Sequence, residues 1–269
     1  MKISTKILII AGSLILVGCI AFVCVMSALK WDFTKLSTAE YETNTTEITE
    51  NFSNITISTE TANIVFASSE NEKCKVECYE NVKAKHYVTV ENDALVIKID
   101  NQKSWYDYIG FNFGVQKITV YLPKTQYNAL SVKGVTGNVK IAKEYSFNAA
   151  EISLTTGNVD FSASVSEELK IKTTTGSVTV ADNAVGSIDV SVTTGTVRLS
   201  KLTCKNDITV GVTTGRTYLT DITCENLSSS GTTGNIDLTN VIAKENLSVK
   251  RSTGNVKLDG IDAAEITLK

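Results

Sequence analysis

The chain has a single histidine and a single proline, and it lacks the short motifs of common catalytic and nucleotide-binding loops. The histidine, His86, lies in an alternating run with Val88 and Val90 and has no recognisable triad partner, so Ser-His-Asp catalysis is not indicated. Gly-x-Ser and glycine-rich phosphate-loop signatures are missing, as is the Gly-Gly-x-Gly-x-Asp repeat of calcium-binding β-helices. We therefore expect no catalytic residues, no cofactor and no metal site, and we predict that the protein is not an enzyme.

Basic residues are too few for a nucleic-acid-binding surface. The chain carries 26 Lys and Arg against 29 Asp and Glu, a formal net charge of −3. Lys2, Lys6 and Lys30 lie at the N-terminus, so 23 basic residues face 29 acidic ones from residue 31 onward, a net charge near −6. A surface of this sign repels a phosphate backbone, and we expect no nucleic acid partner.

Acidic residues do not form the paired pattern that polysaccharide-cleaving β-helices need. Such enzymes require carboxylates grouped on one lateral face. Asp160 and Asp237 share one phase of the repeat described below, three residues after a glycine. The other units fill that phase with mixed residues: Lys140, Thr179, Arg198, Tyr218 and Lys257. A glycan-active β-helix enzyme is therefore the less favoured alternative.

The sequence does contain a clear internal repeat. Seven Thr-Gly steps recur at intervals of 19 or 20 residues. Their glycines are Gly137, Gly157, Gly176, Gly195, Gly215, Gly234 and Gly254. Self-similarity at this period is typical of stacked architectures in which each unit contacts mainly its neighbours. We expect each glycine to form a corner between two strands, because glycine tolerates positive φ, and the threonines before it to stack in ladders.

Apolar and polar residues alternate on both sides of each glycine. At Gly195, Ile188 and Val190 precede the glycine by seven and five positions, and Val197 and Leu199 follow it by two and four. Alternation at period two, rich in Val, Ile and Thr, predicts half-buried strands. A helix would need apolar residues three and four positions apart, and these segments lack that spacing.

The third position before each glycine departs from the apolar pattern. It holds Gly134, Thr173 and Arg251 in three of the units, so we interpret it as part of a corner and not of the core. Together the repeats predict an all-β fold, a single-stranded β-solenoid (β-helix) with coils of 19 to 20 residues.

An eighth, degenerate copy of the repeat precedes the other seven. Ala62 occupies its glycine position, with Ile64 and Phe66 in phase behind it. An insertion between this copy and Gly137 contains four strand-like runs: Cys74–Tyr79, His86–Val90, Ala94–Ile99 and Lys117–Leu122. Because an open solenoid end is a template for strand addition, we expect these runs to form antiparallel strands that cover the first coil.

At the other end the repeat stops in the middle of a coil. Ala264, Ile266 and Leu268 match the strand that precedes a corner, and the glycine of that corner would fall just past Lys269. A final capping strand and a shortened version of a longer sequence are both compatible with this pattern.

The N-terminus carries an apolar segment long enough to cross a membrane. Ile7–Leu29 holds no charged residue, and this length spans a bilayer with some tilt. Lys2 and Lys6 precede the segment, which favours a cytoplasmic N-terminus and an exported remainder, that is, a single-pass protein of the cell membrane. Leu16–Cys19 also resembles a lipoprotein signal with Cys19 as the lipidated residue, and a cleaved secretion signal is a third alternative. All three place the solenoid outside the cytoplasm.

These features divide the chain into three segments. Residues 1–30 are the predicted membrane anchor, residues 31–51 a polar spacer dense in Thr, Glu, Asn and Ser, and residues 52–269 the solenoid domain. Within the solenoid, residues 52–130 hold the first coil and the capping strands, and residues 131–269 hold the regular Thr-Gly repeats.

The six cysteines form three pairs along the sequence: Cys19 and Cys24 in the apolar segment, Cys74 and Cys78 in one strand-like run, and Cys204 and Cys224 one repeat apart. Cys74 and Cys78 share a strand face roughly 13 Å apart, so they cannot bond to each other. Cys204 and Cys224 should stack on adjacent coils, within reach of a disulfide. Buried thiols and a Cys204–Cys224 bridge both remain open, because the sequence does not fix their redox state.

A cluster of aromatic residues lies within the insertion. Its members are Trp105, Tyr106, Tyr108, Phe111 and Phe113. Aromatic side chains grouped in this way either fold over the first coil or form a loop that contacts a ligand or a membrane. We treat them as a candidate contact loop.

Three sequence features together resemble the DUF4097 family, whose members are often labelled putative adhesins. They are the strand before Ala62-Asn63-Ile64, the run Ile118-Thr119-Val120-Tyr121-Leu122-Pro123, and the Thr-Gly-Asn-Val ladder. The resemblance covers roughly residues 50–269. It implies a β-solenoid domain of a bacterial envelope protein, an extracytoplasmic location and a binding or regulatory role. The family offers no established catalytic residues to carry over.

Two functions follow as expectations. The first is a non-enzymatic, membrane-anchored solenoid that binds an envelope polymer or a protein partner, as an adhesin does. The second is an accessory or regulatory protein of a cell-envelope stress response. Neither expectation identifies the ligand or the oligomeric state.

Overall fold

The structure is a computed structural model that describes residues 3–36, 39–69, 72–105 and 114–269. Its contacts divide the chain into two units. The first comprises Met1–Tyr41 and Lys103–Gly114, and the second comprises Glu42–Gln102 and Val115–Lys269.

The first unit contains the long apolar helix α1 (Ile3–Ala28) and a short 3-10 helix, η1 (Phe33–Leu36). Among the described residues, α1 is the one helix long and apolar enough to cross a membrane. Its 26 residues extend about 39 Å, which exceeds a hydrocarbon core of about 30 Å. In the same unit, the Tyr41 hydroxyl donates a hydrogen bond to the Gly114 carbonyl oxygen at 3.2 Å.

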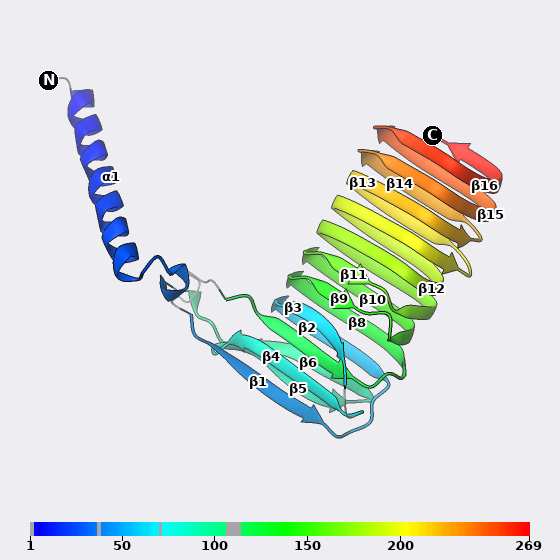
Figure 1. The fold of residues 1–269 in the computed structure, drawn as a ribbon, viewed down its shortest axis with the longest axis horizontal. Helices are drawn as coiled ribbons and strands as arrows, with labels where there is room; N and C mark the ends of the chain where they lie inside the picture. Colours follow the sequence, from blue (N-terminus) through cyan, green and yellow to red (C-terminus); the bar gives the residue numbers. More distant parts are fainter. Residues whose placement is uncertain (1–2, 37–38, 70–71, 106–113) are drawn as a thin grey trace. The chain divides into compact units, whose positions relative to one another are not determined.

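The second unit is built around a parallel β-solenoid of about seven turns (Figure 1). Its strands are β8 (Gln126–Thr136), β9 (Val139–Ile141), β10 (Ser146–Thr156), β11 (Val159–Phe161), β12 (Ser164–Cys204), β13 (Ile208–Cys224), β14 (Leu227–Thr233), β15 (Ile236–Thr253) and β16 (Val256–Leu268). Each residue pairs with the residue of the same phase one coil later, as Ile188 does with Ile208. The predicted fold class, a β-solenoid preceded by one apolar helix, is confirmed.

The repeated glycines stack on one another at one corner of the solenoid. All seven, from Gly137 to Gly254, have φ between 120° and 155°, a conformation that L side chains rarely adopt. A Cβ atom on Gly195 would overlap the carbonyl oxygen of Gly176 one coil earlier, and the other glycines show the same close approach. Gly137 stacks in this way on Ala62, which occupies the corner of the degenerate coil. Backbone conformation and interatomic space both require glycine here.

Asparagine side chains connect the coils directly after the glycine corner. The Oδ1 atom of Asn63 accepts the backbone N–H of Asn138 at 2.8 Å, and that of Asn138 accepts the N–H of Asn158 at 2.9 Å. The Oδ1 atom of Asn158 accepts the N–H of Ser177 at 2.8 Å. The threonines before the glycine are in register, but asparagine carries these side-chain hydrogen bonds between coils.

A second corner lies six residues after the glycine. Asp182, Lys201, Asp221 and Asn240 occupy it with φ between 51° and 56°. The Asn240 side-chain amide donates a hydrogen bond to Asp221 Oδ1 at 2.9 Å. Asp and Asn adopt the left-handed conformation more readily than most residues, so these aspartates have a structural role.

The core contains one more inward position than the sequence predicted. The third residue before each glycine faces the interior, as the buried side chains of Thr173, Val192 and Val212 show. Arg251 occupies the same position; its guanidinium passes over Gly231 and donates a hydrogen bond to the Val212 carbonyl oxygen at 2.8 Å. The interpretation of this position as a corner was wrong, because the strand keeps its alternation up to this residue.

An antiparallel sheet covers the N-terminal end of the core (Figure 1). The strands of this region are β2 (Asn54–Thr61), β3 (Asn63–Ser68), β4 (Cys74–Asn81), β5 (Ala84–Glu91), β6 (Ala94–Asn101) and β7 (Lys117–Leu122). β6 pairs with β2 and β7 with β3, both parallel, whereas β5 runs antiparallel to β6 and β4 antiparallel to β7. The sheet therefore passes from one wall of the solenoid across its end to the other wall.

The second half of the segment predicted as a polar spacer forms a β-strand. Strand β1 (Tyr41–Ile48) lies within residues 31–51 and pairs with β4. An ion pair of 2.5 Å joins Glu42 of β1 to Lys85 of β5. β1 forms here because the edge of β4 offers backbone hydrogen-bonding groups that need partners.

The C-terminal end of the core is open. Val256, Ile266 and Leu268 of β16 are 40%, 47% and 56% exposed. Their register partners one coil earlier are buried: Ile236, Leu247 and Val249. The last coil therefore leaves apolar side chains uncovered at this end of the stack.

Replacing a corner glycine should destabilise the solenoid far more than replacing a strand glycine. We expect Gly195→Ala to lower the free energy of unfolding by about 3 kcal/mol or more, because strained φ and overlap with Gly176 add together. Gly211→Ala is the matched control; the nearest heavy atoms to its new Cβ lie 4.0 Å away, so its effect should stay within about 1 kcal/mol. Urea denaturation midpoints measure both, and equal midpoints would contradict the stacking argument.

Candidate functional site

The outer face of the strands before the glycine corner forms a groove across several coils. Its volume is about 470 Å³. Along its length Ser191 pairs with Gly211, Gly211 with Ser230, and Ser230 with Lys250. Hydroxyl groups form most of its polar lining, from Ser191, Thr193, Thr213, Ser230 and Thr232. Because Thr193, Thr213 and Thr232 share one repeat phase, the groove repeats their hydroxyl groups at the strand spacing of about 4.8 Å.

Two lysines lie toward the ends of this lateral groove. Lys172 and Lys250 occupy the same repeat phase four coils apart, a separation of about 19 Å. Gly211 lies between them and has no side chain to fill the middle of the groove. The arrangement suits an extended polar chain that lies along the solenoid axis and carries hydroxyl or anionic groups.

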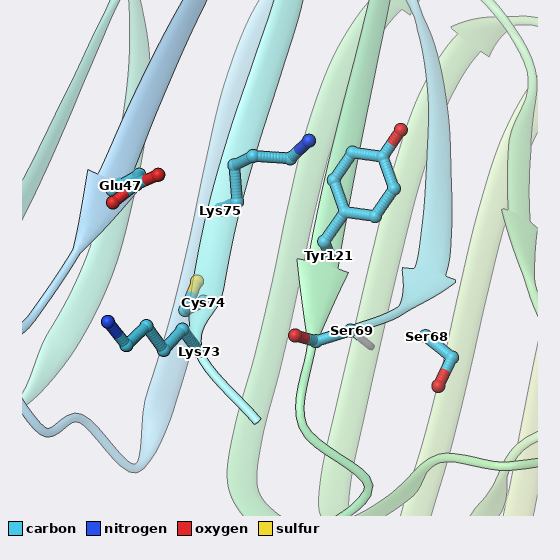
Figure 2. Close-up of a pocket in the computed structure, with 7 residues that line it drawn as sticks. All are labelled: Glu47, Ser68, Ser69, Lys73, Cys74, Lys75 and Tyr121. Carbon is cyan, nitrogen blue, oxygen red and sulfur yellow. The ribbon is translucent and has the colours of Figure 1, made fainter. Parts of the chain in front are cut away.

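A second cavity, of about 460 Å³, lies beside the covering sheet (Figure 2). Lys75 lies with its ammonium group 4.2 Å from the centroid of the Tyr121 ring and 3.8 Å from a Glu77 carboxylate oxygen. Burial raises the pKa of the Cys74 thiol in its lining to about 12, so little thiolate forms near neutral pH. The cavity therefore offers polar contacts, and its Cys74 thiol is not an activated nucleophile.

A buried polar network lies where β4 and β5 diverge. The two strands pair at Asn81 and Ala84; beyond that point the backbone N–H of His86 donates to Glu80 Oε2 at 2.7 Å. His86 Nδ1 lies 2.6 Å from the same oxygen. Glu80 Oε1 accepts a hydrogen bond from the Asn44 side-chain amide at 2.8 Å. The carboxylate thus accepts the His86 backbone N–H in place of a backbone carbonyl of β4.

The network places a hydroxyl, an imidazole and a carboxylate in the order of a hydrolase triad. His86 Nε2 lies 2.9 Å from Thr59 Oγ1, and sequence reasoning found neither this partner nor Glu80. The available signal was the strand alternation, which puts Glu80 on the inner face of β4. The His86 and Glu80 side chains are each 1% exposed and Thr59 is 5% exposed. A substrate has no access to the hydroxyl, so this geometry does not form a hydrolase site.

The predicted aromatic contact loop lies mostly outside the described residues. Trp105 is described, and it is 76% exposed. The other four members fall outside the described part of the chain: Tyr106, Tyr108, Phe111 and Phe113. The contact loop therefore stays a prediction.

Comparison with known proteins identifies the family. The model of the Toastrack domain, DUF4097, matches residues 52–215. The chain belongs to the DUF4097 (Toastrack) family. None of the curated proteins matches it.

Solved structures share the Toastrack architecture at low sequence identity. A "putative adhesin" from Parabacteroides distasonis ATCC 8503 is 14% identical with a TM-score of 0.50, over 86% of this chain and 98% of that chain. A "putative adhesin" from Bacteroides fragilis NCTC 9343 is 17% identical with a TM-score of 0.43, over 87% and 98%. A "putative lipid binding protein" from Parabacteroides distasonis is 15% identical with a TM-score of 0.36, over 86% and 97%. At 14% identity, the likeness to the first of these structures concerns the fold alone.

The aligned aspartates of this Toastrack domain lie too far apart to act on one glycosidic bond. Asp160 pairs with Thr179, and the same row continues through Arg198 and Tyr218 to Asp237. Four strand spacings separate the two carboxylates by about 19 Å. Glycosidase carboxylates lie roughly 5 to 9.5 Å apart, so this pair does not form such a site.

The four cysteines of the Toastrack domain are free, buried thiols in the structure. Thr203 and Thr223 are register partners, and Cys204 and Cys224 follow them on adjacent coils. The Cys204 thiol donates a hydrogen bond to the Gly186 carbonyl oxygen at 3.3 Å. A Cys204–Cys224 disulfide stays a prediction for oxidising conditions.

These thiols should resist alkylation in the folded protein. Burial raises the pKa of Cys74, Cys78 and Cys224 to about 12 and also raises the pKa of Cys204. Because thiolate is the reactive form, we expect iodoacetamide near neutral pH to modify them at least about tenfold more slowly in the folded chain than in urea. Peptide mass spectrometry of the reduced chain measures each rate. Equal rates in the two conditions would refute the buried-thiol assignment.

Proposed function

We propose that the protein is a membrane-anchored, non-enzymatic binding module whose Toastrack domain lies outside the cytoplasm and engages a component of the cell envelope. The apolar helix α1 supports the anchor, and Lys2 and Lys6 before it support a cytoplasmic N-terminus. The shared fold of the "putative adhesin" from Parabacteroides distasonis supports a binding role. The buried state of the His86 network and the distance between the aligned aspartates argue against catalysis at those places.

The lateral groove is the observation that carries this proposal. It presents rows of hydroxyl groups in register over several coils, so a polymer with its own repeat can make similar contacts on successive coils. Many weak contacts along a preformed, rigid surface add up to useful affinity because the surface loses little freedom on binding. Lys172 and Lys250 add attraction for anionic groups on a domain that is otherwise net acidic. An extended envelope polymer with hydroxyl and anionic groups is the ligand class that fits.

Filling the groove tests where the ligand binds. Gly211 has open space around its missing Cβ, so Gly211→Trp should block the groove without strain in the fold. With the full chain in lipid nanodiscs, we expect this variant to bind fractionated envelope polymers at least about tenfold more weakly than the parent chain. Thr179→Trp is the matched control, because Thr179 lies on the other side of the Gly176 corner. Biolayer interferometry compares the affinities.

The charged ends of the groove allow a second comparison in the same assay. The double variant Lys172→Glu and Lys250→Glu should weaken binding of anionic polymers, and the loss should shrink as salt screens the charges. Unchanged affinity in Gly211→Trp would reject the groove as the contact surface. Loss of binding only when the Trp105–Phe113 segment is replaced would move the contact to the aromatic loop. Absence of binding to every envelope fraction would reject the proposed function.

A further inference from the structure

The buried polar network beneath the covering sheet also brings together three potential metal ligands. Cys78, Glu80 and His86 each offer one ligand atom, and these atoms all lie within 4.8 Å of one another. Cys78 and Glu80 face the interior from the same side of β4, and His86 projects from β5. A sulfur, an oxygen and a nitrogen donor thus converge among largely buried side chains.

The thiol in this cluster is the group that the hydrogen-bond network leaves unexplained. Glu80 and His86 bond to each other, and the structure holds Cys78 beside them as a free thiol. A thiol beside a carboxylate and an imidazole completes a set of three donor atoms within reach of one ion.

We propose that Cys78, Glu80 and His86 bind a divalent transition-metal ion, with zinc as the expected ion. Thiolate, imidazole and carboxylate are the ligands that zinc takes in proteins, whereas calcium and magnesium prefer sites made of oxygen ligands. A dication held by one thiolate, one carboxylate and one neutral imidazole gives a site with no net charge. Electroneutrality matters here because an unpaired charge is costly in a buried place.

Neighbouring residues already orient two of the ligands. Thr59 Oγ1 lies 2.9 Å from His86 Nε2, and the Asn44 side-chain amide donates to Glu80 Oε1 at 2.8 Å. With the ion bound to Nδ1, the Nε2–H group donates to the Thr59 hydroxyl oxygen. Such outer partners fix the direction of a ligand and strengthen metal binding. The contact between His86 and Thr59 and the hydrogen bond from Asn44 to Glu80 therefore suit a metal-bound state.

Occupation of the site changes protons and distances in a defined way. On metal binding the Cys78 thiol would lose its proton, and the imidazole, with Nδ1 bound to the ion, would carry its proton on Nε2. Nδ1 and Glu80 Oε2, now 2.6 Å apart, separate to about 3.3 Å as the ion takes the place of the proton between them. Three protein ligands leave a fourth position for water. The ion would join β4 to β5 where these strands diverge and so strengthen the cover of the solenoid.

Cobalt provides a direct probe of this site. We expect the full chain, reduced and in detergent micelles, to bind one equivalent of Co²⁺ with a sulfur-to-cobalt charge-transfer band in the near ultraviolet, and Zn²⁺ to abolish that band. Cys78→Ser should remove the band, and His86→Gln should weaken Co²⁺ binding at least about tenfold. Cys74→Ser is the matched control, because Cys74 lies on the same face of β4 four residues earlier and outside the cluster. It should leave band and affinity unchanged.

A variant that keeps all three ligands guards against a folding artefact. Thr59→Val preserves shape and removes the partner of Nε2, so the band should remain while the dissociation constant for Zn²⁺ rises about 10- to 100-fold. Zn²⁺ should also raise the melting temperature of the parent chain but not of Cys78→Ser, with circular dichroism confirming that each variant is folded. A parent chain that binds no Co²⁺, or a charge-transfer band that survives Cys78→Ser, overturns the proposal. Should Cys78→Ser fail to fold, an unchanged Zn²⁺ affinity in Thr59→Val overturns it.

Discussion

Contact between the backbones of successive coils at the glycine corner is the constraint on which this domain depends. Gly195 approaches the carbonyl oxygen of Gly176 so closely that no side chain fits, and its φ of 155° excludes most other residues. This contact sets the register between coils. Once the register is fixed, asparagines such as Asn158 accept a hydrogen bond from a backbone N–H of the next coil. Aspartates such as Asp221 occupy the second corner, and aliphatic side chains stack in continuous rows. A shift of one residue would turn every row outward.

The covering sheet buries the outer side of the first coil, where no further coil stacks. Its strands follow β3, the last strand of the degenerate coil, and cross the end of the core before the regular repeat begins. Covering a solenoid with antiparallel strands forces β4 and β5 apart beyond Asn81 and Ala84. Backbone groups become unpaired at that point, and the Glu80 carboxylate supplies the missing acceptor. The buried position of the Glu80 carboxylate is thus a consequence of how this end of the solenoid is closed.

Local patterns predicted most of the fold, and contacts between distant segments account for what they missed. The alternation of apolar and polar residues identified the strands, and the interval of 19 to 20 residues identified the glycine corners, because both patterns can be read directly along the sequence. Arg251 could not be placed from its own coil, since the room for its guanidinium exists only because Gly231 lies beside it. The partners of His86 come from β2 and β4, and nothing in the run around His86 indicates them. The groove was not predicted from the sequence, because its shape depends on small residues at equivalent repeat positions in several successive coils.

Stacking between neighbouring coils allows the number of coils to change without a change in the covering sheet. An internal coil contacts only the coils beside it, so removing or duplicating the stretch between two successive corner glycines keeps every row in phase. Each such change would move the far end by one strand spacing, about 4.8 Å, and would add or delete one rung of the hydroxyl-lined surface. The number of coils can therefore change in discrete steps while the covering sheet stays unaltered.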